Sequence, residues 1–365
     1  MLPGTLNASS LIWVEDAAHA VVMTAVGRLE EQSFPVPAVG RDDGVLRVEA
    51  TGICGSDHSQ FRGHLPGIGA VTPVIPGHEI VGRIEAAGPE ALARWGVAEG
   101  DLVVLHEVVQ ADTGMLVYGI TVPTTTAPAL WGGYATHVYL HPRAVLHRVP
   151  DGVTAEEAAL FVPIANGIRW AATVPGTQAG DTVVVCGPGQ QGLGCVVGAV
   201  RAGAARVVVT GRNADAVRLA IARELGAAHT IVVDDDDPVA VVLDITGGRG
   251  ADVVVDASAG STEPVVQAIE MARSGGTVIL GGLKAGATVP GFVSDRVVLR
   301  QLRVQGVGGH DHASVDAALE VIASRAFPLD RMRSHTFPLA EAEHAIRVVG
   351  REVEGADPVH VTLVP

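Results

Sequence analysis

The chain has 365 residues, of which 48% are hydrophobic, and it carries a formal net charge of −15 at pH 7. This length exceeds one ordinary hydrophobic core and predicts two domains. The acidic balance argues against a nucleic-acid partner or an anionic membrane surface. No uncharged apolar run is long enough to span a membrane.

The three cysteines, Cys54, Cys186 and Cys195, form no pattern typical of a disulfide framework. A reducing cytoplasm is the expected location. The N-terminus lacks a basic region, and Glu15 and Asp16 interrupt its apolar stretch, which excludes a standard signal peptide.

Residues 1 to about 165 read as mostly β-structure, with frequent glycine and proline. Strand candidates are residues 44–50, 79–85 and 101–105, and no long amphipathic helix interrupts them.

From about residue 166 to 305, strands and helices alternate. This alternation predicts an α/β domain with a doubly wound, six-stranded parallel sheet. The expected strands are 182–186, 206–210, 230–233, 252–256, 277–281 and 302–306, with helices at 214–225 and 263–273. The tail then has two helix candidates, 314–324 and 339–349, and a last strand at 359–364, and we expect it to return to the first domain.

One glycine-rich stretch organises the second half of the chain. Gly187, Gly189 and Gly192 follow the strand at 182–186 with the spacing G-x-G-x-x-G, and a helical pattern through Leu193 follows. The first glycine permits a tight turn, the second lets a pyrophosphate approach, and the third lets helix and strand pack closely. The helix N-terminus directs N–H groups and a partial positive charge at the phosphates. A dinucleotide site is therefore favoured over a glycine-rich turn in some other α/β protein.

Two segments of the β-rich part carry metal-ligating side chains. Gly-Ile-Cys-Gly-Ser-Asp places Cys54 and Asp57 on a turn after a strand, and Pro-Gly-His-Glu places His78 and Glu79 before another strand. Cysteine and histidine suit zinc, and a catalytic zinc has about three protein ligands and one open position. Singly, each segment is better explained by a buried cysteine or a capping histidine. Together they favour a zinc site.

With these motifs, the sequence resembles the medium-chain dehydrogenase/reductase superfamily and, within it, the zinc-dependent alcohol dehydrogenases. The resemblance covers nearly the whole chain after the first twenty residues. It rests on Cys54-Gly-Ser-Asp57, Gly77-His-Glu-x-x-Gly82 with Gly88, the glycine turn, and smaller matches at Gly100-Asp-Leu-Val103, Gly132-Gly-Tyr-Ala135 and Gly275-Gly-Thr277.

The resemblance implies a GroES-like catalytic domain, residues 1–165 and 306–365, into which a Rossmann domain, residues 166–305, is inserted. It implies an enzyme that transfers hydride between a nicotinamide cofactor and a small, apolar alcohol or carbonyl compound. A homodimer or homotetramer is the expected assembly.

The resemblance also implies roles for single residues. Cys54 and His78 would bind one catalytic zinc, and Glu79 would lie beside the metal, able to bind it or to exchange with water. Asp57 would orient His78 through its other ring N–H. Ser56 would hydrogen-bond the substrate oxygen and pass its proton outward.

Three departures from the family pattern bear on this assignment. Val162 stands where the family places a third zinc ligand. Ser59 stands at the place of a relay histidine, so His58 is either its substitute or an ordinary surface histidine. Residues 106–120 contain no cysteine, so a structural zinc is not expected and packing alone would hold that lobe.

The residues expected to contact the cofactor lie in the glycine turn and at neighbouring strand ends: Gly187, Gly189, Gln190, Gln191, Gly192, Leu193, Thr210, Gly211, Arg212, Asn213, Gly281 and Gly282. An acid at the end of the second strand favours NAD, and a basic residue suits the 2′-phosphate of NADP. Arg212 stands there without an acid. This slightly favours NADP, although Arg212 could also be solvated while Asn213 bonds the ribose.

Two other functions stay open from the sequence. A zinc-free enoyl or quinone reductase of the same superfamily is favoured by Val162 and opposed by Cys54 with His78. A non-enzymatic dinucleotide sensor is weakly opposed by Ser56 and Asp57. The aromatic residues Phe61, Trp131 and Trp170 suggest an apolar pocket or, equally, a hydrophobic core.

Overall fold

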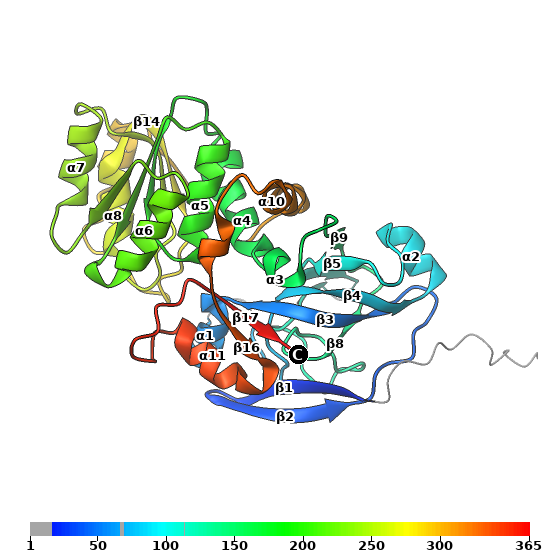
Figure 1. Ribbon diagram of the computed structural model, residues 1–365. Helices are drawn as coiled ribbons and strands as arrows, with labels where there is room; N and C mark the ends of the chain where they lie inside the picture. Colours follow the sequence, from blue (N-terminus) through cyan, green and yellow to red (C-terminus); the bar gives the residue numbers. More distant parts are fainter. Residues whose placement is uncertain (1–16, 66–68, 113) are drawn as a thin grey trace, which may run out of the picture. The chain divides into compact units, whose positions relative to one another are not determined.

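A computed structural model gives the fold and describes residues 17–65, 69–112 and 114–365 (Figure 1). The stretch with Glu15 and Asp16, used above to exclude a signal peptide, lies outside these residues. Contacts divide the chain into two compact units: residues 1–159 with 335–365, and residues 160–334. The second unit extends past the predicted residue 305 because helix α10 (His312–Ser324) packs against α4 (Phe161–Ile168) and does not join the first domain.

The second unit contains the predicted six-stranded parallel sheet, in the order β12-β11-β10-β13-β14-β15. Its three central strands, β10, β11 and β13, contain runs of buried valine, as expected for a parallel sheet with both faces covered. All six strands lie at or within a few residues of their predicted positions: β10 (Thr182–Cys186), β11 (Arg206–Gly211), β12 (His229–Val232), β13 (Ala251–Asp256), β14 (Ala272–Leu280) and β15 (Arg303–Gly306).

Helices cover the sheet in two groups, because the direction of winding reverses between β10 and β13 (Figure 1). Helix α5 (Gln190–Arg201) contacts α6 (Ala216–Glu224) and α4, while α7 (Pro238–Ile245) contacts α8 (Glu263–Met271). The remaining elements are the π-helical turn η1 (Arg169–Thr173), the 3-10 turns η2 (Asn213–Asp215) and η3 (Leu329–Met332), and α9 (Ser294–Leu299).

The first unit is built around a seven-stranded sheet with the path β16-β17-β3-β4-β5-β9, in which β8 also pairs with β3. The longest strands are β3 (Gly44–Ile53) and β4 (Glu79–Ala87), and they pair antiparallel. The others are β5 (Leu102–Leu105), β8 (His137–Leu140), β9 (Leu146–Arg148), β16 (Arg333–Pro338) and β17 (His360–Val364). Residues from both ends of the chain thus share one sheet, as the resemblance implied.

Smaller elements complete this unit. Strands β1 (Ala18–Ala25) and β2 (Arg28–Phe34) form a two-stranded ribbon, and β6 (Val108–Ala111) pairs with β7 (Gly114–Val117). The β6–β7 hairpin occupies the stretch without cysteines, where Val108 packs against Leu65, Val117 and Ile120. The helices are α1 (Gly55–Phe61), α2 (Pro89–Trp95), α3 (Ala155–Ala158), η4 (Leu339–Glu341) and α11 (Ala342–Val349).

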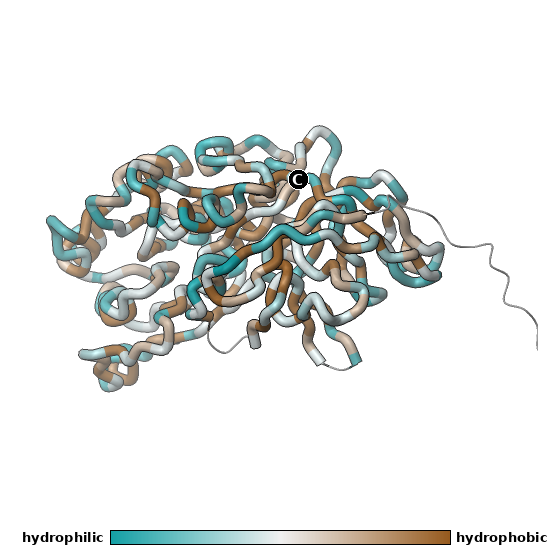
Figure 2. The backbone as a smooth tube through the Cα atoms, turned by 90° about the horizontal axis from the view of Figure 1, so that it is seen from below, coloured by the Kyte–Doolittle hydropathy of each residue, from teal (hydrophilic) through white to brown (hydrophobic). Residues whose placement is uncertain are grey.

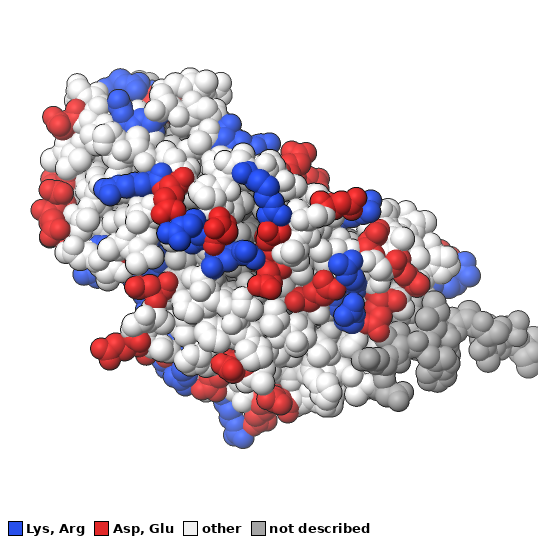
Figure 3. All heavy atoms as spheres, viewed as in Figure 1, with Lys and Arg blue, Asp and Glu red and all other residues white. Residues whose placement is uncertain are grey.

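The outer and inner parts of the chain differ in polarity. Figure 2 shows polar residues, in teal, at many outer turns and apolar residues, in brown, along the inner segments. On the face in Figure 3, basic and acidic side chains are interspersed. Among the described residues, no helix combines the length and the apolar character that crossing a membrane requires.

Candidate active site

The first group of site residues lies where β3 leads into α1. Cys54 is the N-cap of this helix, and its backbone N–H donates a 2.7 Å hydrogen bond to the Asp57 carboxylate three residues later. This is the reciprocal bond of a capping box, and it satisfies a helix-terminal donor. It fixes the turn so that Cys54, Ser56 and Asp57 lie together.

The second group is brought to this turn by the register of the β3–β4 pair. Glu79, the first residue of β4, lies opposite Gly52 near the end of β3. A side chain at position 52 would overlap the Glu79 carboxylate, so glycine leaves the space in which that group lies. His78 precedes Glu79 and is likewise buried. Gly52 and Glu79, 27 positions apart in the sequence, are therefore joined by strand pairing.

Together these segments form a cluster of metal-ligating atoms. One ligand atom each from Cys54, His78 and Glu79 lies within 4.8 Å of the other two. His78 directs Nδ1 toward Asp57 Oδ1 at 3.4 Å and Nε2 toward Ser56 Oγ at 3.3 Å. Of the residues predicted for this site, the structure thus gathers Cys54, Ser56, Asp57, His78 and Glu79.

Asp57, His78 and Glu79 are buried, and Cys54 is half-buried. Burial by itself lowers the pKa of His78, but the Asp57 carboxylate and its hydrogen bond outweigh that effect and raise the pKa well above its ordinary value. Tyr134 is fully buried nearby. Its pKa is raised well above the ordinary value by burial and then by the negative charges of Asp57, Glu79 and Cys54. Among the described residues, the Tyr134 hydroxyl has no hydrogen-bond partner.

The Glu79 carboxylate shows that the cluster suits a cation. Glu79 is 0% exposed, and neither of its oxygens accepts a hydrogen bond from any residue that the structure describes. The Nε2 atom of His360 in β17 lies 3.6 Å from Glu79 Oε2. A buried carboxylate without donors is costly, and a metal would compensate it. Thiolate, imidazole and carboxylate are the ligands of a catalytic zinc.

His58, predicted as a possible proton relay, directs its ring elsewhere. It lies on α1, and its Nε2 bonds Glu352 Oε1 at 2.7 Å. Glu352 also accepts hydrogen bonds from Arg62 and Arg347. The hydrogen bonds from Arg62 first and His58 next lower the pKa of Glu352 to about 2. The contact anchors α1 to the segment after α11.

The glycine turn of the second unit has the geometry that its spacing predicts. Gly187 has φ +96°, a conformation that side chains rarely adopt. Gly189 is the N-cap of α5, and a methyl group there would meet no atom within 4 Å. A methyl group on Gly192 would overlap the Gly187 carbonyl oxygen. The turn thus leaves open backbone at the N-terminus of α5, the usual place of a phosphate.

Neighbouring strand ends bring the other predicted cofactor residues to the same edge of the sheet. Thr210 and Gly211 end β11, and the Gly187 N–H donates to the Thr210 carbonyl oxygen. Gly281 and Gly282 follow β14 and both donate to the Asp256 carbonyl oxygen at 2.9 Å. The remaining predicted residues, Gln190, Gln191 and Leu193, lie in the first turn of α5. Gln191 Oε1 accepts a hydrogen bond from Asn166, and Leu193 is fully buried.

Arg212 is exposed but has an acidic neighbour. Its Nε lies 3.2 Å from Asp234 Oδ1, and the Asn213 backbone N–H donates to Asp234 Oδ2 at 2.8 Å. These contacts lower the pKa of Asp234, the Asn213 bond first. Asp234, in the loop after β12, therefore contacts the two residues that follow β11. The strand-end pattern did not predict this contact.

Three aromatic residues do not support the expected apolar pocket. Phe61 and Trp131 belong to the hydrophobic cores of the first unit. Trp170 lies in the second unit, 6% exposed, with its ring N–H bonded to the Gly309 carbonyl oxygen. Val162, at the place of the family's third ligand, is buried in α4 of the second unit.

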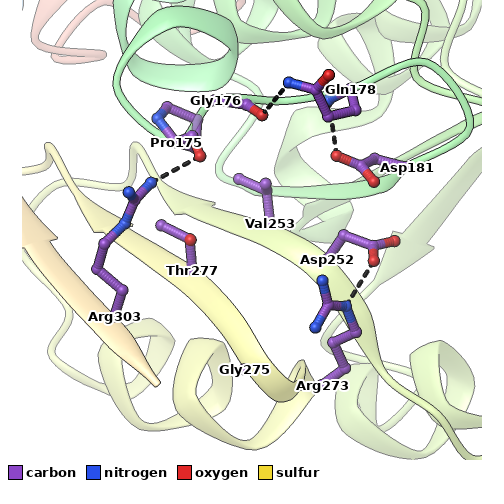
Figure 4. A pocket seen from close by; sticks show the side chains of 10 residues that line it. All are labelled: Pro175, Gly176, Gln178, Asp181, Asp252, Val253, Arg273, Gly275, Thr277 and Arg303. Atoms are coloured by element: carbon purple, nitrogen blue, oxygen red, sulfur yellow. Dashed lines mark hydrogen bonds and ion pairs between the residues drawn. The ribbon is translucent and has the colours of Figure 1, made fainter. Parts of the chain in front are cut away.

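A polar pocket of about 310 Å³ lies in the second unit, away from the glycine turn (Figure 4). Asp252, Thr277 and Arg303 line it, and they lie toward the amino ends of β13–β15 as these strands pair. Ligands of such sheets bind at the carboxyl ends. In Figure 4 the charged groups bond one another or the backbone: Arg273 bonds Asp252, and Arg303 bonds the Pro175 carbonyl oxygen. We assign this pocket a structural role.

Comparisons with known proteins agree with this arrangement. Residues 40–151 match the alcohol dehydrogenase GroES-like domain, and residues 192–324 match the zinc-binding dehydrogenase domain. The chain is 41% identical over 366 residues to a Mycobacterium tuberculosis protein named "Probable alcohol dehydrogenase adh", covering 95% of this chain and 98% of that one. It is 31% identical to the erythritol/L-threitol dehydrogenase of Mycolicibacterium smegmatis, covering 93% and 94% of the two chains.

Among solved structures, a zinc-binding dehydrogenase of Sinorhizobium meliloti bound to NADP has a TM-score of 0.82 and 27% identity, covering 96% of this chain and 100% of that chain. The fold, the two matched domains and the relatives lead to one assignment. The chain belongs to the zinc-dependent alcohol dehydrogenases of the medium-chain dehydrogenase/reductase superfamily, oxidoreductases that act on CH–OH groups.

Proposed function

We propose that this dehydrogenase interconverts a small alcohol and its carbonyl compound at the cluster of Cys54, His78 and Glu79. The observation that carries the proposal is the buried Glu79 carboxylate, which has no hydrogen-bond donor among the described residues and lies within 4.8 Å of the other two ligand atoms. When bound, zinc supplies the Lewis acidity that lowers the pKa of an alcohol, and the nicotinamide supplies the hydride chemistry.

The surrounding residues support this centre. Asp57 Oδ1 lies 3.4 Å from His78 Nδ1, so Nε2 is the ring nitrogen that is left for the metal. Ser56 lies beside that nitrogen, where its hydroxyl would hydrogen-bond the substrate oxygen and, as it takes the alcohol proton, pass its own proton outward to solvent. His58, bonded to Glu352, then serves to hold the helix that carries Ser56.

We propose one zinc per chain. After dialysis, metal analysis of the wild type is expected to find about one zinc, and Cys54→Ala to lose both zinc and turnover. Cys195→Ala removes a buried thiol elsewhere and is expected to keep both. A wild type without zinc, together with a fully active Cys54→Ala, would contradict the proposal.

The polarity of the substrate and the choice between NAD and NADP follow from other residues. Because Phe61 and Trp131 are core residues, the sequence argument for an apolar substrate no longer holds, so turnover assays need to include polyols as well as simple alcohols. Arg212 at the end of β11 supports NADP as the preferred cofactor, and the Sinorhizobium relative binds NADP.

We propose a homodimer formed through the segment between β14 and β15. Leu283, Phe292, Val293, Val298 and Leu299 are 45–81% exposed, and β15 is an edge strand of the parallel sheet. Exposed apolar groups beside a free strand edge favour a partner of the same kind. Light scattering is expected to give twice the chain mass, and Leu299→Glu to give the monomer. Cys54, Cys186 and Cys195 form no disulfide, which supports a reducing compartment such as the cytoplasm.

A further inference from the structure

The carboxyl edge of the parallel sheet holds a buried ion pair that the reaction does not use. Asp256, the last residue of β13, lies beside Cys186, the last residue of β10, and directly precedes the loop that packs on the glycine turn. Asp256 is 0% exposed. Lys284, in the segment after β14, places Nζ 2.9 Å from its Oδ2 and 3.2 Å from its Oδ1.

Lys284 is the only lysine in the sequence, although the chain has 25 lysine and arginine residues in all. Its Nζ also donates to the carbonyl oxygen of Ser258 at 2.6 Å and to Ser258 Oγ at 2.9 Å. A compact ammonium has three donors that can reach three different acceptors, whereas a planar guanidinium fork cannot adopt this arrangement. The contacts therefore explain why this position has lysine.

Ser258, held by Lys284, lies against the glycine turn. A methyl group on Gly187 would come within 3.0 Å of Ser258 Cα and Cβ, and one on Gly282 would overlap the Ser258 carbonyl oxygen. The Ser258 N–H and Oγ both bond Asp256 Oδ1, at 3.0 and 2.6 Å. Ser258 thus packs between Gly282, which follows β14, and the glycine turn, where phosphates are expected to bind.

The charge of Lys284 has a second effect. Without it, Asp256 would be an uncompensated buried carboxylate close to the turn that receives an anionic pyrophosphate. Such a charge is costly in itself, and in a low-dielectric site it would repel the phosphates. The ammonium removes both penalties.

We propose that Lys284 is a positioning residue for the dinucleotide: it holds Ser258 against the glycine turn and neutralises Asp256 beside the pyrophosphate. This inference rests on the proposed cofactor site. Lys284 acts on the part common to NAD and NADP, so its removal weakens both to the same extent.

The same strand supplies a matched control. At its amino end, Asp252 is 7% exposed and pairs with Arg273 at 2.6 Å and Arg249 at 3.1 Å, beside the pocket of Figure 4. Arg273→Met removes a cation from a buried carboxylate of β13, as Lys284→Met does, but away from the glycine turn.

The test measures the Kd of NADP and of NAD for zinc-loaded protein without substrate, by calorimetry, together with the Tm of each variant. We expect Lys284→Met to weaken both dinucleotides at least about tenfold, while kcat at saturating cofactor stays within about threefold. Lys284→Arg is expected to recover only part of the affinity. The double variant Lys284→Met with Asp256→Asn removes the uncompensated charge as well. It is expected to recover more of the dinucleotide affinity than Lys284→Arg does. Arg273→Met is expected to lower Tm and leave both Kd values within about twofold.

Equal losses of cofactor affinity in Lys284→Met and Arg273→Met would overturn the inference, as would a Kd within twofold of wild type in Lys284→Met. If Lys284→Met does not fold, Lys284→Arg and the double variant decide the question by the same criteria. A wild type that binds neither dinucleotide would instead refute the proposed function.

Discussion

The two candidate sites use different atoms of the chain. Side-chain atoms form the Cys54–His78–Glu79 cluster of the first unit, and backbone atoms form the Gly187–Gly192 turn of the second. The cluster consists of side-chain atoms, whose positions depend on a helix cap and on the register of two strands. The turn consists of backbone, and its essential property is missing side chains. A side-chain site therefore depends on which group is present, and a backbone site depends on how much space is left.

The largest effect is expected where the backbone site loses its space. In Gly192→Ala the new methyl group overlaps the Gly187 carbonyl oxygen, so we expect a loss of about 1–3 kcal/mol in unfolding free energy and loss of dinucleotide binding. Gly189→Ala meets no protein atom, so it is expected to keep the stability within about 1 kcal/mol and still lose at least tenfold in cofactor affinity. Denaturation curves and calorimetric titration distinguish the two. Equal stabilities for both variants would contradict this account.

The side-chain site is tested by an exchange that keeps its shape. Glu79→Gln removes the anionic ligand without changing the size of the side chain. If Glu79 binds the metal directly in at least part of the cycle, as we propose, zinc is expected to be lost in dialysis. If Glu79 only supports the other ligands, zinc affinity should fall by roughly 10–100-fold. Chelator competition measures the difference.

Glu85→Gln, on the same strand β4 and 3.0 Å from His137, is the control and is expected to retain zinc. A zinc-bound structure with the metal more than about 3 Å from both Glu79 oxygens would rule out direct ligation in that state.

A smaller effect is expected at Arg212, beside the glycine turn, which we propose distinguishes NADP from NAD. Arg212→Ala should weaken NADP about tenfold and NAD much less, because a charge-assisted pair with the 2′-phosphate contributes about 1.5–3 kcal/mol. Arg223→Ala, an exposed arginine on α6, is the control. Initial rates with both cofactors measure this, and equal constants in wild type and variant would show that Arg212 does not contact the phosphate.

The smallest effect concerns the contact that anchors α1. The pKa of Glu352 is lowered to about 2 by Arg62 and His58, so its contribution to stability is present above the unfolded pKa and is lost as pH falls toward 2. We expect Glu352→Gln to lower Tm by a few degrees at pH 7, with a gap from wild type that narrows below about pH 4.5. Glu354→Gln, two residues on, should match wild type throughout. A Tm difference between Glu352→Gln and wild type that stays constant with pH would exclude this ion pair as the cause of the difference.

The sequence predicted what short-range patterns specify. Runs of valine and the glycine spacing gave the six parallel strands and the turn, because each depends on neighbours within a few residues. The two motifs together favoured a zinc site with Cys54 and His78, and the place of Glu79 beside the metal came from the resemblance.

What the sequence did not predict depends on distant partners. The amphipathic pattern of α10 indicates a buried face but not that α4 covers it. The contacts of Glu352 with His58, of His360 with Glu79 and of Lys284 with Asp256 join residues that no local spacing relates. They depend on tertiary packing, which brings polar groups together from separate elements.

The position of His360 in β17 has a consequence for biosynthesis. The strand partners of β17 include β3, made more than 300 residues earlier, and His360 faces the Glu79 carboxylate. The ribosome makes the whole of residues 160–334 between these two parts. Because domains fold as units during synthesis, the nucleotide-binding unit is ready to fold while the first sheet still lacks β17. The surroundings of Glu79 are therefore complete only after residues 335–365 have emerged, so a metal bound at Glu79 would gain its full enclosure after the nucleotide-binding unit has been made.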